Sequence, residues 1–131
     1  MTVFWLPLLL SLAGAAPVAL APVSQASADP GARAFQRCAA CHALAPGRSD
    51  AADEAAPALQ GVFGRRAGTL AGFAYSEAMR AAGRGGLVWN AATLDRYLAD
   101  PEAAVPGTHM PYQGGSAAER AAVIDWLRRA G

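Results

Sequence analysis

The sequence predicts an all-α domain, in which a few short helices are connected by glycine-rich loops. Two observations predict this class. No stretch alternates apolar and polar residues with a period of two, so we expect no substantial sheet. Four segments instead begin with a residue whose side chain can cap a helix, namely Asp29, Ser76, Asn90 and Ser116.

The first two predicted helices are marked by their capping residues. Asp29 followed by Pro30 predicts a helix that runs into Cys38, because aspartate is a favoured N-cap and proline a favoured first helical residue. Ser76 caps a second short helix, which we expect to stop at Gly83 because glycine commonly ends helices.

The last two predicted helices lie in the C-terminal third of the chain. Asn90 caps a helix that should end before Pro101, since the residue before a proline disfavours the helical conformation. Ser116 and Glu119 form a capping box for the final helix. The apolar stripe of that helix consists of Val123, Ile124 and Leu127.

Loops account for much of the remaining sequence, at residues 43–57, 61–73 and 104–115. The second of them contains four glycines and cannot be a regular element. The helices carry too few large apolar residues to build a full core alone, so we expect another apolar group to fill the centre of this small domain.

The first 28 residues contain no charged side chain. An apolar run over residues 3–12 is followed by small residues and by Ala26-Ser27-Ala28, which predicts a secretory signal peptide cleaved after Ala28. A retained membrane anchor is the alternative, since a span needs roughly 20 apolar residues, although three prolines make this segment a poor one. In both cases we expect the folded domain, residues 29–131, to lie outside the cytoplasm.

Both cysteines lie in the motif CAACH, residues 38–42. Such a motif can be a redox dithiol, half of a zinc site or a site of covalent haem c attachment. Zinc needs about four ligands, and the chain has two cysteines and two histidines, with His109 isolated in a loop. A thioredoxin-like dithiol requires a βαβ context, which is not predicted here. We therefore expect one haem c, attached through Cys38 and Cys41, with His42 as an axial ligand of the iron.

A sixth iron ligand has three candidates, His109, Met79 and Met110. Met79 lies in the middle of a predicted helix, where a core role is the simpler interpretation. Met110 lies in a loop between Pro106 and Pro111, where the backbone can be rigidly aimed. We favour Met110, with a gap-filling methionine as the alternative.

The charge of the chain limits its partners. The formal net charge is +1, and all eleven basic residues are arginines. A net charge this small argues against a nucleic-acid partner that is held by electrostatics. We expect a monomer without a nucleic-acid partner.

The sequence resembles the class I cytochromes c, in the group of mitochondrial cytochrome c and bacterial cytochrome c2. The resemblance covers nearly all of residues 29–131. It runs from FQRCAACH through PALQGVFGRRAGTLAGFAYSEAM, LVWNAATLDRYLADP and VPGTHMPYQG to RAAVIDWL. It implies the small all-α cytochrome c fold, with three to five short helices wrapped around a covalently bound haem c.

The resemblance also implies roles for single residues. Cys38 and Cys41 would form the thioethers, and His42 and Met110 would be the axial iron ligands. The haem environment would comprise Pro57, Arg65, Tyr75, Trp89, Tyr97 and Thr108.

These surrounding residues are expected to act in different ways. The carbonyl of Pro57 would accept a hydrogen bond from His42. Arg65, Tyr75 and Trp89 would surround a buried haem propionate, and Thr108 would help to close the second one. Tyr97 would form a hydrogen bond near the sulfur of Met110.

The function implied by the resemblance is one-electron transport in the periplasm, without enzymatic activity. The donor would be a bc1-type complex, and the acceptor a terminal oxidase, a peroxidase or a photosynthetic reaction centre. Two alternatives remain open, a membrane-tethered carrier and a haem peroxidase-like protein with a labile sixth ligand.

Overall fold

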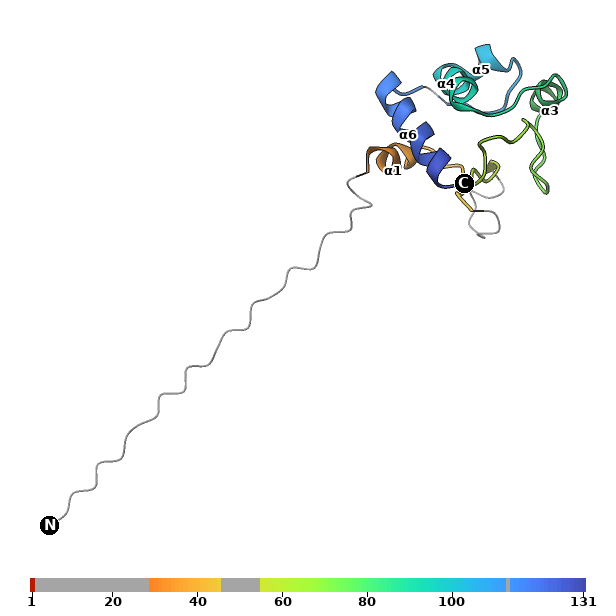
Figure 1. Ribbon diagram of the computed structural model, residues 1–131. Helices are drawn as coiled ribbons and strands as arrows, with labels where there is room; N and C mark the ends of the chain where they lie inside the picture. Colours follow the sequence, from red (N-terminus) through yellow and green to blue (C-terminus); the bar gives the residue numbers. More distant parts are fainter. Residues whose placement is uncertain (2–28, 46–54, 113) are drawn as a thin grey trace.

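The computed structural model describes Met1 and residues 29–45, 55–112 and 114–131 (Figure 1). Most of the predicted signal peptide and part of the 43–57 loop therefore lie outside the described residues. The labelled helices are α1 (Pro30–Phe35), α3 (Glu77–Arg84), α4 (Ala91–Ala99), α5 (Pro101–Ala104) and α6 (Ala117–Arg129). Apart from one isolated antiparallel bridge between Arg66 and Val88, no strand occurs in the described part. The predicted all-α class is confirmed.

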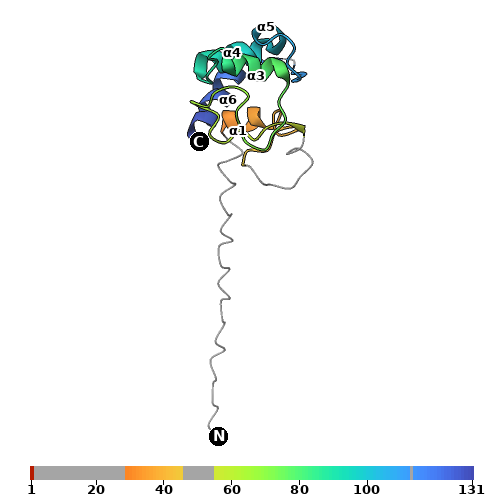
Figure 2. The ribbon, with the colours of Figure 1, turned by 90° about the vertical axis from the view of Figure 1, so that its right-hand side faces the viewer.

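Helices α1 and α6 cross in close contact (Figures 1 and 2). A Cβ atom on Gly31 would lie 2.4 Å from the Cβ of Trp126 and 2.5 Å from the carbonyl oxygen of Ala122. Only a residue without a side chain therefore fits at this crossing. The ring of Phe35 packs on that of Trp126, with centroids 4.6 Å apart.

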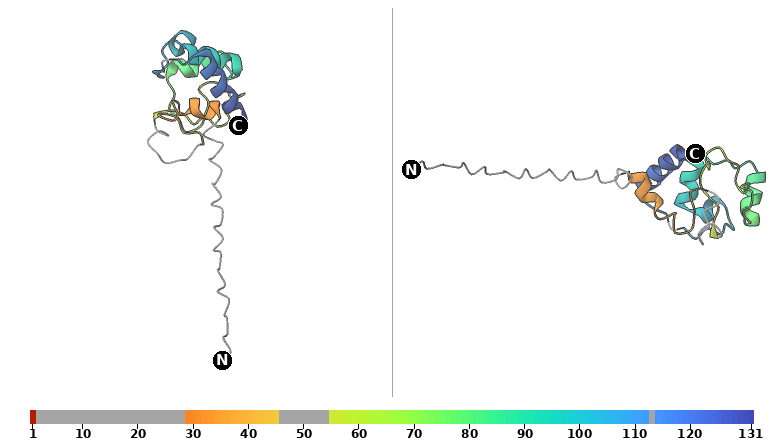
Figure 3. Two further views of the ribbon diagram at one scale, coloured as in Figure 1. Left: turned by 90° about the vertical axis from the view of Figure 1, so that its left-hand side faces the viewer. Right: turned by 90° about the horizontal axis from the view of Figure 1, so that it is seen from below.

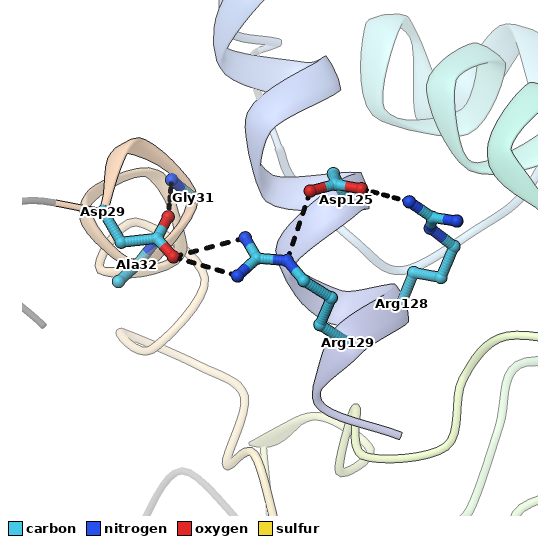
Figure 4. Close-up of polar contacts among 6 residues, drawn as sticks. All are labelled: Asp29, Gly31, Ala32, Asp125, Arg128 and Arg129. Carbon is cyan, nitrogen blue, oxygen red and sulfur yellow. Dashed lines mark hydrogen bonds and ion pairs between the residues drawn. The ribbon is translucent and has the colours of Figure 1, made fainter.

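The same corner is fastened by charged side chains (Figure 4). Asp29 caps α1 by accepting hydrogen bonds from the backbone N–H groups of Gly31 at 2.8 Å and Ala32 at 3.4 Å. Its other carboxylate oxygen lies 3.2 Å from both terminal nitrogens of Arg129, close to the end of α6. Arg129 also donates to Asp125, so a short network joins the start of α1 to the end of α6.

Helix α4 packs against both α6 and α5 (Figure 3), and side chains of α4 and α6 form a large part of the hydrophobic core. The predicted stripe of α6 is buried, as is the inner face of α4. These buried side chains are Val123, Ile124, Leu127, Leu94, Tyr97 and Leu98.

Helix α3 contacts none of the other labelled helices and packs instead on the loop that precedes it. A Cβ on Gly83 would lie 1.9 Å from the carbonyl oxygen of Ala67, so glycine is required there for close approach. The helix continues through Gly83 to Arg84 and is capped by Gly85. The predicted stop at Gly83 is therefore wrong, because this glycine serves packing and not termination.

Helix α5 is absent from the sequence-based prediction. Asp100 caps it by accepting a hydrogen bond from the N–H of Ala103 at 3.0 Å, and Pro101 is its first residue. The sequence predicted only that the preceding helix ends before Pro101, although a similar pair, Asp29-Pro30, begins α1. None of the helices among the described residues is long and apolar enough to cross a bilayer.

Candidate haem site

The CAACH motif forms a tight turn directly after α1. The helix ends at Phe35, earlier than predicted, and the N–H of Cys38 then donates to the carbonyl of Phe35 at 2.8 Å. The carbonyl of Cys38 accepts from the N–H groups of Cys41 at 3.0 Å and His42 at 2.8 Å. The two thiols and the imidazole are therefore displayed from one compact turn.

Neither cysteine forms a disulfide. Cys38 is partly buried and packs against the core, whereas Cys41 is exposed. Burial raises the pKa of the Cys38 thiol, and the charge of Arg37 partly offsets this effect. Both thiols are free for thioether formation.

The side chain of His42 is held by the backbone of the next loop. Its Nδ1 lies 2.7 Å from the carbonyl oxygen of Pro57. A carbonyl can only accept, so Nδ1 must carry the proton and donate it, which leaves the lone pair on Nε2. Burial lowers the pKa of His42, although the bond to Pro57 opposes this change. A neutral imidazole with one free nitrogen is the form that binds metals.

Two further contacts hold the Pro57 loop beside His42. The N–H of Leu59 donates to the carbonyl of Ala43 at 3.1 Å, and that of Gln60 to Leu44 at 2.7 Å. Arg65 adds a hydrogen bond from Nη2 to the carbonyl of Ala58 at 2.9 Å. Arg65 therefore supports the loop that orients His42, a role that the sequence did not predict.

Met110 lies in a loop that is anchored just before it. The hydroxyl of Tyr97 lies 2.6 Å from that of Thr108, and the N–H of Thr108 donates to the carbonyl of Val105 at 3.0 Å. Met110 is partly buried and packs against the core. Met79, the rival candidate, is only 8% exposed and belongs to the core cluster.

Some of the residues that were predicted to surround the haem propionates lie close to one another. Trp89 is 8% exposed, and its ring lies 5.1 Å from that of Tyr97. Burial raises the pKa of the Tyr75 hydroxyl, and the charge of Arg65 partly offsets this rise. The hydroxyls of Tyr97 and Thr108 are hydrogen-bonded to each other just before Met110.

A hollow of about 200 Å³ adjoins this region, between α4, α5 and residues 87–89. Trp89 and Tyr97 line it together with Leu87, Thr93, Arg96 and the 103–105 segment, whereas His42 and Met110 do not. This hollow therefore does not mark the space between the two proposed axial ligands.

The residues present fit a haem c. Their donor set consists of two free thiols, a neutral imidazole and a partly buried thioether, which suits a covalently attached porphyrin iron. No group of three or more His, Cys, Asp or Glu side chains that could hold a metal ion occurs among the described residues. Trp89 is a buried residue. A buried indole N–H needs a hydrogen-bond acceptor, and a haem propionate would supply one.

Comparisons with known proteins agree with this chemistry. The cytochrome c family model matches residues 28–131. Cytochrome c2 of Rhodoplanes tepidamans is 43% identical over 86 residues, which cover 66% of this chain and 75% of that protein. For cytochrome c2 iso-2 of Magnetospirillum fulvum the identity is 43% over 96 residues, or 72% and 93% of the two chains.

Solved structures show the same similarity. The ferricytochrome c2 of Rhodopseudomonas palustris superposes with a TM-score of 0.69 at 34% identity, over 78% of this chain and 96% of that one. Cytochrome c2 from Rhodospirillum centenum gives the same TM-score and identity, over 79% and 98% of the two chains. The chain therefore belongs to the cytochrome c family, as a monohaem electron-transfer protein with one covalently attached haem c and no enzymatic activity.

Proposed function

We propose that this cytochrome is a periplasmic one-electron carrier whose iron is ligated by His42 and Met110. Its donor would be a bc1-type complex, and its acceptor a terminal oxidase, a peroxidase or a photosynthetic reaction centre. The observation that carries the proposal is the 2.7 Å contact between Nδ1 of His42 and the carbonyl of Pro57, which leaves only Nε2 free for a metal. The haem supplies the one-electron chemistry, since its iron changes between the ferrous and ferric states.

The protein contributes rigidity at the two ligands. His42 is fixed by Pro57, whose loop is held in turn by Arg65 through Ala58. Met110 is fixed through the Tyr97–Thr108 contact two residues before it. Ligands that stay in place during a change of charge keep the reorganisation small, which suits a carrier better than a catalyst.

The propionates would be held by donors that the fold already buries. Trp89 is buried and offers an indole N–H, and the charge of Arg65 acts on the hydroxyl of Tyr75. Arg65 keeps donor capacity after its bonds to the 58–60 backbone, because a guanidinium has five N–H groups. Thr108 would close the second propionate from the Met110 loop.

Export is part of the proposal. Residues 1–28 would act as the signal peptide, with cleavage after Ala28, and residues 29–131 would form the cytochrome domain. Asp29, the N-cap of α1, would then be the first residue of the mature chain. Sequencing the N-terminus of mature protein decides between cleavage and a retained anchor.

The ligand assignment is tested by substituting each methionine in protein produced with a c-type maturation system. We expect Met110→Ala to abolish the near-infrared absorption band of methionine-ligated ferric iron, because the thioether sulfur is lost. Met79→Leu removes the only other thioether of residues 29–131 and should keep the band. An intact band in Met110→Ala would refute the assignment, and an open-site spectrum of the unsubstituted protein at neutral pH would favour the peroxidase-like alternative.

A further inference from the structure

We propose that Glu102 is a positioning residue that fastens the turn before Met110 and thereby limits how often this methionine leaves the iron. The inference rests on the proposed function, since it assumes that Met110 binds the iron. Glu102 lies in α5, and its Oε1 accepts a hydrogen bond from the backbone N–H of Gly107 at 3.0 Å. We refer to this bond as the latch. It joins α5 to the segment that carries the proposed ligand.

The segment from Val105 to Thr108 forms a β-turn. The N–H of Thr108 donates to the carbonyl of Val105 at 3.0 Å, and Gly107 has a φ of 85°. Proline at the second position, here Pro106, and a glycine with positive φ at the third position are typical of a type II turn. The bond that closes this turn does not use the N–H of Gly107, so this donor needs a partner from elsewhere.

Helix α5 holds Glu102 in place to supply that partner. Asp100 caps the helix by accepting a hydrogen bond from the N–H of Ala103 at 3.0 Å. The N–H of Val105 donates to the carbonyl of Pro101 at 2.9 Å. The backbone on both sides of Glu102 is therefore fixed, and only its side chain has to be ordered for the latch to form.

Two other helices also hold the turn. The hydroxyl of Tyr97 in α4 lies 2.6 Å from that of Thr108. A Cβ atom on Gly107 would lie 3.3 Å from the Cβ of Ala78 in α3, so the turn packs closely against that helix. Two consecutive residues shortly before Met110 are thus hydrogen-bonded to different helices, and without the latch only the bond to α4 remains.

The latch lies at the surface, which limits its strength. Both Glu102 and Gly107 are exposed. The net contribution of one such hydrogen bond to stability is modest, so its loss should leave the domain folded. The same contribution changes the opening equilibrium of the loop severalfold, because an equilibrium constant depends exponentially on free energy.

A competing interpretation is that Glu102 only stabilises α5. Acidic side chains favour the first turn of a helix, where the backbone N–H groups carry partial positive charge, and Glu102 lies there. The two roles predict different results for two matched variants. Glu102→Asp keeps the charge in the first turn but shortens the side chain by one methylene group. Glu102→Gln loses the charge and keeps an acceptor oxygen at the same reach.

The opening of the loop can be measured with imidazole, which binds ferric iron only after Met110 has left it. We expect Glu102→Ala to raise the apparent imidazole affinity of the holoprotein about fivefold, as the loss of one net hydrogen bond predicts. Glu102→Asp should produce a similar rise, and Glu102→Gln a rise of about twofold or less. Hydrogen exchange at the Gly107 amide, followed by NMR in the ferrous holoprotein, should accelerate in the same order. Should Glu102→Ala misfold, the comparison of Glu102→Asp with Glu102→Gln decides the question.

The two proposals fail separately. Equal imidazole affinities for Glu102→Ala and the unsubstituted protein, with the methionine band present in both, would overturn the latch alone. A rise in Glu102→Gln that equals or exceeds the rise in Glu102→Asp would also overturn it, since the effect would then follow the charge in α5 and not the bond to Gly107. Absence of the methionine band in the unsubstituted protein would overturn the proposed ligation itself.

Discussion

Asp29 shows how one side chain performs two tasks in this protein. One carboxylate oxygen caps α1 and the other meets Arg129 near the end of α6 (Figure 4). The pKa of Asp29 is lowered, chiefly by the hydrogen bond from the N–H of Gly31 and also by Arg129. A carboxyl group whose folded pKa is depressed contributes stability above its unfolded pKa of about 4, and this contribution is lost as the pH falls through the folded pKa.

The two tasks can be separated by substitution. At neutral pH we expect Asp29→Ala to lower the melting temperature of the mature holoprotein more than Asp29→Asn, because asparagine still caps the helix but cannot pair with Arg129. The stability gap between Asp29→Asn and the unsubstituted protein should begin to narrow as the pH falls below about 4, where the carboxyl is protonated in the unfolded chain, and should close as the pH falls through the lower folded pKa. Thermal unfolding followed by circular dichroism measures both effects. A gap that stays constant to low pH would show that the charge of Asp29 does not contribute.

The position of α3 depends on a glycine, Gly83. It contacts no other labelled helix, and Gly83 brings it against the carbonyl of Ala67. The N–H of Ala67 bonds in turn to the carbonyl of Leu87 at 2.9 Å. Close approach at Gly83 therefore positions the segment that leads to Trp89.

We expect Gly83→Ala to destabilise the holoprotein by about 2 kcal/mol, because the added methyl group would overlap the Ala67 carbonyl and force the helix away. Gly85→Ala is the matched control. A Cβ there would meet only helix carbonyls at 3.4 Å, and the backbone is already in the right-handed helical region. Guanidinium unfolding of both variants tests this. Equal free energies of unfolding for the two variants would mean that α3 can move away from Ala67 without loss of stability.

Sequence alone predicted the elements whose signals are local. The caps at Ser76, Asn90 and Ser116 all start helices as expected, since capping depends on residues within one turn. The role of Gly83 was predicted wrongly and that of Pro101 only in part, because each residue type has two structural roles. Glycine can end a helix or admit a neighbour, and proline can end one helix or begin the next. The contact of Gly83 with Ala67 is set by tertiary packing, which no local pattern reveals.

The candidate site also contains some contacts that were predicted and others, set by tertiary packing, that were not. The resemblance predicted the bond between His42 and Pro57, which the structure contains. The hydrogen bonds from Arg65 to the carbonyls of Ala58 and Gln60 were not predicted. Every backbone carbonyl is a possible acceptor, and the sequence does not indicate which ones an arginine will reach. The sequence predicted that Glu119 belongs to a capping box. It did not predict the ion pair of Glu119 with Arg37, because the two residues are far apart in the sequence.

Across the whole molecule, positive and negative charges are interleaved. Glu77 pairs with Arg80 and Arg84, Asp95 with Arg120, and Asp125 with Arg128 and Arg129. Arg37, beside the attachment turn, is matched by Glu119. With a net charge of +1 and six arginines of the described residues in ion pairs, the molecule should attract a partner only weakly over long distances.

We therefore expect the second-order rate of reduction by a purified bc1-type complex to change by less than about threefold between low and physiological ionic strength. Apolar contact, and not long-range steering, would then determine productive encounters. Stopped-flow measurements across a salt series test this. A fall of an order of magnitude with added salt would show that a charged docking face exists after all.

The ion pair between Asp29 and Arg129 means that both ends of the domain leave from a single corner. Glu119 lies ten positions before Arg129 on the same helix, which separates the two along the helix axis by about 15 Å. A linker, a fused protein or an electrode surface joined at either end of residues 29–131 would therefore start from this one corner. A single attachment point can thus hold the cytochrome by either end and leave the start of α6 uncovered.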